Sequence, residues 1–150
     1  MPVVATEQSV WSFSATPRAI ASAIVDGPGA SAAFMGGVVA YDNMVKHELL
    51  GVPSPTLEQF GAVSPETAEA MARGVAEKLH TDCSVATTGI ASPGGGTAEK
   101  PVGLVYVSAF LKGRCEVREF RFRGGRDAIR QRAVAKALLL ALEMLKTTEC

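Results

Sequence analysis

The sequence has no excess of charge of either sign. Lys and Arg together number 15, as do Asp and Glu, so the formal net charge is zero. Proteins that bind nucleic acid or an anionic membrane normally carry a basic excess, so neither partner is expected. Basic residues do gather between Lys112 and Arg132, which leaves a local basic patch open.

Cysteine, histidine and long apolar runs are also scarce. Cys83, Cys115 and Cys150 form no C-x-x-C pair, which predicts free thiols in a reducing compartment. His47 and His80 stand apart, so no metal site is expected. No apolar run reaches the ~18 residues of a membrane span, and the N-terminus lacks a signal-peptide pattern. We therefore expect a soluble, cytoplasmic protein.

The most distinctive stretch that is present is glycine-rich, residues 87–103 (TTGIASPGGGTAEKPVG). It holds five glycines between two apolar segments that predict strands. Such a loop is costly in chain entropy, which favours a role in binding through the main chain over a long surface turn. Neither G-x-x-x-x-G-K-[ST] nor a helix-opening G-x-G-x-x-G occurs, because Lys100 is followed by Pro101 and a predicted strand.

Local patterns predict alternating strands and helices in one domain that covers residues 1–150. Strands are expected near residues 10–13, 34–41, 82–88, 102–111 and 115–122, with a hairpin turn at Lys112-Gly113. Helices are expected near residues 17–25, 43–50, 65–79 and 126–146, with a short helical turn up to Phe60. Residues 38–41 are expected to form a buried strand. The pattern predicts a three-layer α/β/α domain with a mixed β-sheet.

Polar side chains with catalytic potential fall where strands end or helices begin, which is where sites in such domains gather. They are Ser14, Thr16, Tyr41, Lys46, Thr88 with the glycine loop, Arg126 and Arg130. Taken alone, each is typical of a polar surface. Arg126 and Arg130, one helical turn apart, can form a clamp for a carboxylate or phosphate.

A serine nucleophile needs a base, and neither histidine is placed to serve it. Lys46 is the alternative, because Ser–Lys pairs replace the histidine in some hydrolases. A free lysine has a pKa of about 10.4, so work as a base at pH 7 requires a shift of about three units, on the order of 4 kcal/mol. Taken alone, Lys46 is typical of a solvated helix face.

Several of these segments together resemble the C-terminal domain of the CinA competence/damage-inducible proteins. The segments are residues 38–43 (VVAYDN) with Lys46, residues 50–52 (LGV), residues 61–64 (GAVS) and residues 88–103. This family of nicotinamide-nucleotide amidohydrolases converts nicotinamide mononucleotide to nicotinate mononucleotide and ammonia. The resemblance covers about Ile20 to Leu145.

The resemblance implies a Ser/Lys amidase that acts on a small-molecule nucleotide, needs no metal or other cofactor and forms a homo-oligomer. Tyr41 and Lys46 match the family's tyrosine and catalytic lysine, and Thr88 matches the hydroxyl residue before the first loop glycine. Arg126, or Arg130, matches an arginine near the start of the last helix. The substrate-binding residues implied in the loop are Gly89, Gly94, Gly95 and Gly96.

The first strand-to-helix turn departs from the family's A-E-S-C-T-G-G. An ungapped placement puts residues 12–18 (SFSATPR) there, which makes Ser14 the nucleophile and Thr16 a substrate-binding residue. A placement with an insertion uses residues 6–9 (TEQS) and makes Ser9 the nucleophile. Two functions remain open: the amidohydrolase, and a catalytically silent relative that binds a nucleotide or a protein partner.

Overall fold

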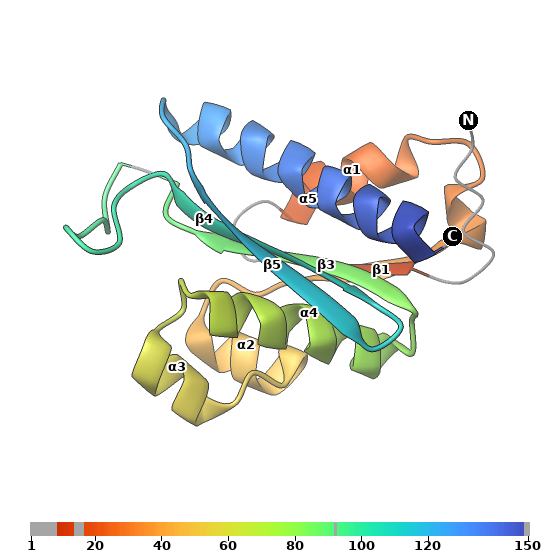
Figure 1. Cartoon of the computed structure of the whole chain (residues 1–150), viewed down its shortest axis with the longest axis horizontal. Coiled ribbons are helices and arrows are strands. Elements are labelled where there is room, and N and C mark those ends of the chain that lie inside the picture. The colour runs from red at the N-terminus through yellow and green to blue at the C-terminus, as the bar shows by residue number, and fades with distance from the viewer. Residues whose placement is uncertain (1–8, 14–16, 92, 149–150) are drawn as a thin grey trace.

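A five-stranded sheet runs through the molecule, with helices on both of its faces (Figure 1). The computed structural model describes residues 9–13, 17–91 and 93–148, with the main chain alone for residues 9–13, 17 and 18. The strand order is β2-β1-β3-β4-β5. The strands are β1 (Ser9–Phe13), β2 (Phe34–Val39), β3 (Cys83–Gly89), β4 (Leu104–Leu111) and β5 (Arg114–Arg121).

The helices form two layers. On one face lie α1 (Pro17–Val25) and α5 (Arg126–Thr148); on the other lie α2 (Asn43–Leu50), α3 (Ser54–Phe60) and α4 (Pro65–Leu79). A short 3-10 helix, η1 (Ala30–Ala32), precedes β2. β1 is parallel to β2 and β3, whereas β3–β4 and β4–β5 are antiparallel. The predicted three-layer α/β/α arrangement with a mixed sheet is confirmed.

Capping residues explain where the helices on the second face begin and end. The Asp42 carboxylate accepts a 2.8 Å hydrogen bond from the Met44 amide at the start of α2. Gly51 ends that helix in the left-handed region, at φ 67°. Ser64 Oγ accepts from the Thr67 amide at 3.1 Å, and Pro65 occupies the first turn of α4. These boundaries match those predicted from the sequence.

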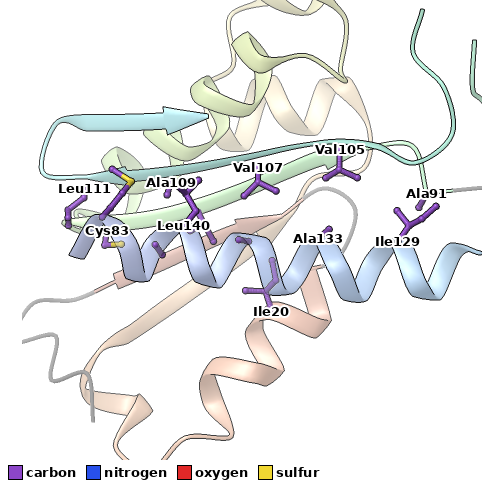
Figure 2. Packing of buried hydrophobic residues seen from close by; sticks show 14 residues of the cluster. Ile20, Cys83, Ala91, Val105, Val107, Ala109, Leu111, Ile129, Ala133 and Leu140 are labelled. Atoms are coloured by element: carbon purple, nitrogen blue, oxygen red, sulfur yellow. The ribbon is translucent and has the colours of Figure 1, made fainter. Parts of the chain in front are cut away.

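The larger core fills the space between α5 and the sheet. Figure 2 shows Ile129, Ala133 and Leu140 of α5 facing the strands, with Val105 and Val107 on β4. The apolar side chains of α5 are buried to different extents. Leu138 and Leu145 are only partly buried, whereas Leu140 and Met144 are fully buried. Over a helix this long, the 3.6-residue period turns positions 140 and 144 toward the sheet.

A second core joins α4 to the opposite face of the sheet and to the end of α2. Met71 and Val75 of α4 pack with Leu50 and Val52, all of them fully buried. The two helices approach so closely that a Cβ atom at Gly74 would lie 1.6 Å from the Leu50 carbonyl oxygen. This contact fixes α2, and therefore everything α2 carries, against the sheet.

The prediction of a buried strand over residues 38–41 is wrong. β2 ends at Val39 and is an edge strand, bonded to β1 alone among the described strands. The Val39 side chain is 62% exposed, and that of Tyr41 is 80% exposed. An apolar run is typical of central and edge strands alike, so the sequence could not separate them.

Two smaller expectations can also be compared with the structure. Cys83 and Cys115 are free thiols, as predicted, and burial raises the pKa of each to about 11. In the described part of the chain, no helix is both long and apolar enough to cross a bilayer. The described glycine-rich segment projects beyond the sheet as the β3–β4 connection (Figure 1).

Candidate active site

The carboxyl ends of three parallel strands meet at one edge of the sheet. Phe13 at the end of β1 pairs with Val39 at the end of β2, and Trp11 pairs with Val85 of β3. Because the three strands run in the same direction, the chain leaves all of them at this edge. Sites in doubly wound α/β domains form at such edges.

A cavity of about 480 Å³ lies at this edge. It is lined by Tyr41, Lys46, Ala62, Val63, Thr88, Gly89, Ile90, Ala91, Pro93, Gly94, Gly95 and Arg126. The structure therefore brings together most of the predicted site residues, which come from the chain that follows β2, from α2 and β3, from the glycine loop and from α5. Its volume is in the range of small-molecule sites.

Lys46 is a buried lysine that lines this cavity. Its side chain is only 3% exposed, and its Nζ donates to the main-chain oxygens of Ala40 at 3.1 Å and Tyr41 at 2.9 Å. Burial lowers the pKa of Lys46, and the nearby Asp42 carboxylate opposes part of that shift. The prediction of a solvated Lys46 is wrong, because the chain leaving β2 surrounds the amine with its own carbonyls.

The hydrogen bonds of Lys46 suit an amine that takes up a proton. A neutral primary amine has two N–H groups and one lone pair. The Ala40 and Tyr41 carbonyls accept two N–H bonds, and Lys46 also lines the cavity. When the amine is neutral, these two bonds use both N–H groups and its lone pair can accept a proton, as a general base requires.

The two arginines differ in their position relative to the cavity. Arg126 is the first residue of α5 and lines the cavity, so its guanidinium adds to the positive end of the helix dipole. An anionic group would be stabilised there. Arg130, one turn later, is not among the described lining residues, and its Nε is buried without a hydrogen-bond partner in the described structure. The structure thus does not form the predicted two-arginine clamp around the cavity.

Tyr41 and Thr88 have different environments. Tyr41 lines the cavity but is mostly exposed, at its mouth. Thr88 is buried, and its Oγ1 donates to the Ala62 carbonyl at 2.6 Å. That bond fixes the α3–α4 turn, whose residues Ala62 and Val63 line the cavity. Sequence reasoning missed these two residues as lining groups, because they contribute main chain and small apolar surface rather than a reactive side chain.

The loop glycines also differ in their position relative to the cavity. Gly94 and Gly95 line the cavity, and Gly95 has a φ of 87°, a conformation that L side chains rarely adopt. Gly96 is not among the described lining residues. A Cβ atom there would lie 2.7 Å from the Val102 amide nitrogen, so its lack of a side chain serves packing within the loop.

The structure allows only one of the two placements of the nucleophile to be compared. Ser14 and Thr16 lie outside the described residues, between Phe13 and Pro17. Ser9 pairs with Phe34 and Cys83, at the opposite end of the parallel strands. Cys83 is five residues before Thr88, which corresponds to roughly 17 Å along an extended strand. The placement that brings Ser9 into the site is therefore wrong.

Metal chemistry has no evident ligand set in the described part of the chain. No group of three or more His, Cys, Asp or Glu side chains there is placed to hold a metal ion.

Sequence comparisons match one family. The model of the family described as CinA C-terminal domain matches residues 10–145, a range that includes Ser14 and Thr16 and excludes Ser9. A Clostridium kluyveri protein named as competence-damage inducible is 52% identical over 125 residues, 83% of this chain and 30% of its own length. A CinA-like protein of Parasynechococcus marenigrum is 49% identical over 127 residues, with the same shares. The chain thus spans about a third of the length of these relatives.

Solved structures have the same fold. The competence/damage inducible protein CihA from Agrobacterium tumefaciens superposes with a TM-score of 0.87 at 40% identity, over 97% of this chain and 87% of its own. A CinA superfamily protein from Klebsiella pneumoniae 700603 gives a TM-score of 0.90 at 27% identity, over 95% of this chain and 89% of its own.

Proposed function

Because the chain belongs to the CinA C-terminal domain family, we propose that its cavity hydrolyses the carboxamide of nicotinamide mononucleotide, giving nicotinate mononucleotide and ammonia. The observation that carries the proposal is the environment of Lys46. A buried amine, held by two main-chain carbonyls and with a lowered pKa, lines a cavity that Arg126 and the loop glycines also line. That combination suits amide hydrolysis by a lysine base.

In the proposed reaction, the Ser14 hydroxyl gives its proton to neutral Lys46 as its oxygen bonds to the amide carbon. The tetrahedral intermediate then breaks its C–N bond, and the leaving nitrogen takes the proton from the Lys46 ammonium to depart as ammonia. Water, deprotonated in turn by Lys46, attacks the remaining ester. The C–O bond to Ser14 breaks, Ser14 Oγ recovers its proton from the Lys46 ammonium, and the acid leaves as its carboxylate. One base serves both half-reactions, as in other Ser–Lys hydrolases.

Substrate binding is assigned to the rest of the cavity. Arg126 at the start of α5 offers a positive charge for the phosphate of the nucleotide. Gly94 and Gly95 allow the ligand to approach the main chain of the loop. In the proposed reaction, main-chain donors of the glycine loop would hold the developing oxyanion, which is usually a large part of catalysis in acyl transfer. Tyr41, at the mouth, orients the substrate.

One observation favours a second candidate, a catalytically silent relative that binds a nucleotide or a protein partner. Helix α1 begins at Pro17, which has no amide hydrogen, where the family motif has its glycine pair. The start of this helix therefore offers one main-chain donor fewer to an anion than a glycine would.

The test is ammonia release from nicotinamide mononucleotide by the wild type, Ser14→Ala and Ser9→Ala. We expect release by the wild type and by Ser9→Ala, and a loss of about a thousandfold or more in Ser14→Ala, as for other serine nucleophiles. If the wild type binds the nucleotide and releases no ammonia, the silent relative is the correct assignment.

A further inference from the structure

The glycine loop is tied together at two places along its own length. At its base, the Ile90 amide donates to Leu104 O at 2.9 Å, and the Gly103 amide donates to Ile90 O at 2.7 Å. Near its tip, the Thr97 amide donates to Lys100 O at 2.8 Å, and the Lys100 amide donates to Thr97 Oγ1 at 3.0 Å. Gly94 and Gly95, which line the cavity, lie between these two ties in an exposed part of the chain.

A third tie connects the loop to the opposite wall of the cavity. Lys100 Nζ donates to the main-chain oxygen of Phe60, the last residue of α3, at 2.6 Å. The next residue is Gly61, whose φ is 79°, and a Cβ atom there would lie 3.2 Å from Lys100 Nζ. The glycine therefore leaves room for the ammonium group to reach the end of the helix. A cation there also meets the negative end of the helix dipole.

The α3–α4 turn that receives Lys100 is itself rigidly held. Gly61 O accepts from Thr67 Oγ1 at 2.7 Å and from Ser64 Oγ at 3.1 Å, while Ala62 O accepts from Thr88 Oγ1 at 2.6 Å. Phe60 O is thus a fixed anchor next to the cavity wall. The loop, in contrast, has exposed residues from Pro93 to Glu99.

We propose that Lys100 is a positioning residue that latches the glycine loop to the α3–α4 turn and so presets Gly94 and Gly95 for the nucleotide. Lys100 is not among the described residues that line the cavity and, in the proposed function, does not meet the reacting atoms; it acts through the loop. The inference deepens the proposed function and rests on it for the identity of the ligand. The latch itself rests only on the contacts above.

The expected effect follows from the population of the latched loop. If removal of the ammonium leaves the binding-competent loop about 10% populated, apparent affinity for the ligand falls about tenfold. At saturating substrate, binding restores the binding-competent arrangement of the loop, so kcat changes much less than KM. A residue that served only global stability would not raise KM while leaving kcat nearly unchanged.

The test compares Lys100→Met, Lys100→Arg and, as a matched control, Lys78→Met, which removes an exposed lysine near the end of α4. Hydrogen exchange is measured on the amides of Thr97 and Lys100 in the full chain without ligand. We expect about tenfold faster exchange in Lys100→Met, with Ile90 and Gly103 still protected, partial rescue by Lys100→Arg and no change in Lys78→Met. Wild-type exchange in Lys100→Met would overturn the latch.

The same variants are then titrated with nicotinamide mononucleotide. We expect Kd and KM to rise about tenfold in Lys100→Met and kcat to stay within about twofold. Faster exchange with unchanged Kd in a protein that binds the nucleotide would contradict the positioning role. If the wild type fails to bind the nucleotide, the proposed function fails, and the exchange result still decides for or against the latch.

Discussion

The two walls of the cavity each carry a lysine bonded to main-chain carbonyls, but they are built differently. The α2 wall holds Lys46 by burial, and it is fixed to α4 through the close approach at Gly74. The loop wall is mostly exposed and is held by a few hydrogen bonds, one of them from Lys100. The base of the proposed reaction thus lies on the tightly packed wall, and the main chain that would face a ligand lies on the looser one. Reactive geometry needs rigid support, whereas a ligand must enter and leave.

The largest effect is expected where packing fixes the α2 wall. Alanine normally stabilises a helix interior relative to glycine by about 1 kcal/mol. In Gly74→Ala the sign should reverse, with a loss of about 3 kcal/mol, because the new Cβ would overlap the Leu50 carbonyl oxygen. Urea unfolding measures the change in the free energy of unfolding. The matched control is Gly125→Ala, where a Cβ atom would meet nothing within 4 Å. Equal stability of Gly74→Ala and the wild type would show that the α2 wall can shift.

A smaller effect is expected at the base of the loop wall. Gly103 has a φ of 94°, and a Cβ atom there would lie 2.0 Å from Phe122 O. The left-handed conformation alone costs an L residue about 1–2 kcal/mol. Phe122 follows the end of β5 and is only partly buried, so its carbonyl can move away from the new Cβ, and Gly103→Ala should lose about 2 kcal/mol by the same unfolding measurement. A larger loss than in Gly74→Ala would show that the loop wall tolerates a new side chain less well than the α2 wall does.

The smallest of these stability effects should come from the bond that joins β3 to the α3–α4 turn. Thr88→Val keeps the side-chain shape but removes the 2.6 Å bond to Ala62 O, and leaves that carbonyl without its donor. We expect a loss of about 1 kcal/mol in the free energy of unfolding. Thr88→Ser keeps the hydroxyl, so its free energy of unfolding should remain within a few tenths of a kcal/mol of the wild-type value. Equal losses in both variants would assign the effect to the methyl group instead.

The sequence predicted the parts of this molecule that depend on local signals. Asp42 with Gly51, and Ser64 with Pro65, define helix ends through neighbouring residues only, and the interleaved strands and helices then determine the layers. The glycine loop could be recognised from its composition. These signals depend on short stretches of chain, which is why they could be interpreted without a structure.

The environment of each lysine could not be predicted in this way. Lys46 is buried where the chain leaving β2 folds its carbonyls around the amine, and α2 is held in place there by its contact with α4 at Gly74, a residue 28 positions later in the chain. Lys100 meets Phe60 across 40 residues of sequence, through a main-chain oxygen that any residue would offer. The exposed edge position of β2 depends on strand order, which residues 38–41 do not encode locally. Contacts of side chains with distant main chain leave no residue pattern to detect.

The rate of ammonia release from saturating nicotinamide mononucleotide, followed against pH in the wild type and Lys46→Met, tests the central claim most directly. Lys46 must be neutral to act as a base, so the rate should rise as pH increases through its pKa. Because burial lowers that pKa, the rise should come below the ordinary lysine value of about 10.4. Lys46→Met should lose this rise and about a thousandfold of the rate, a typical contribution of a general base. Ammonia release by Lys46→Met at the wild-type rate, with the same pH profile, would contradict the assignment of Lys46 as the base.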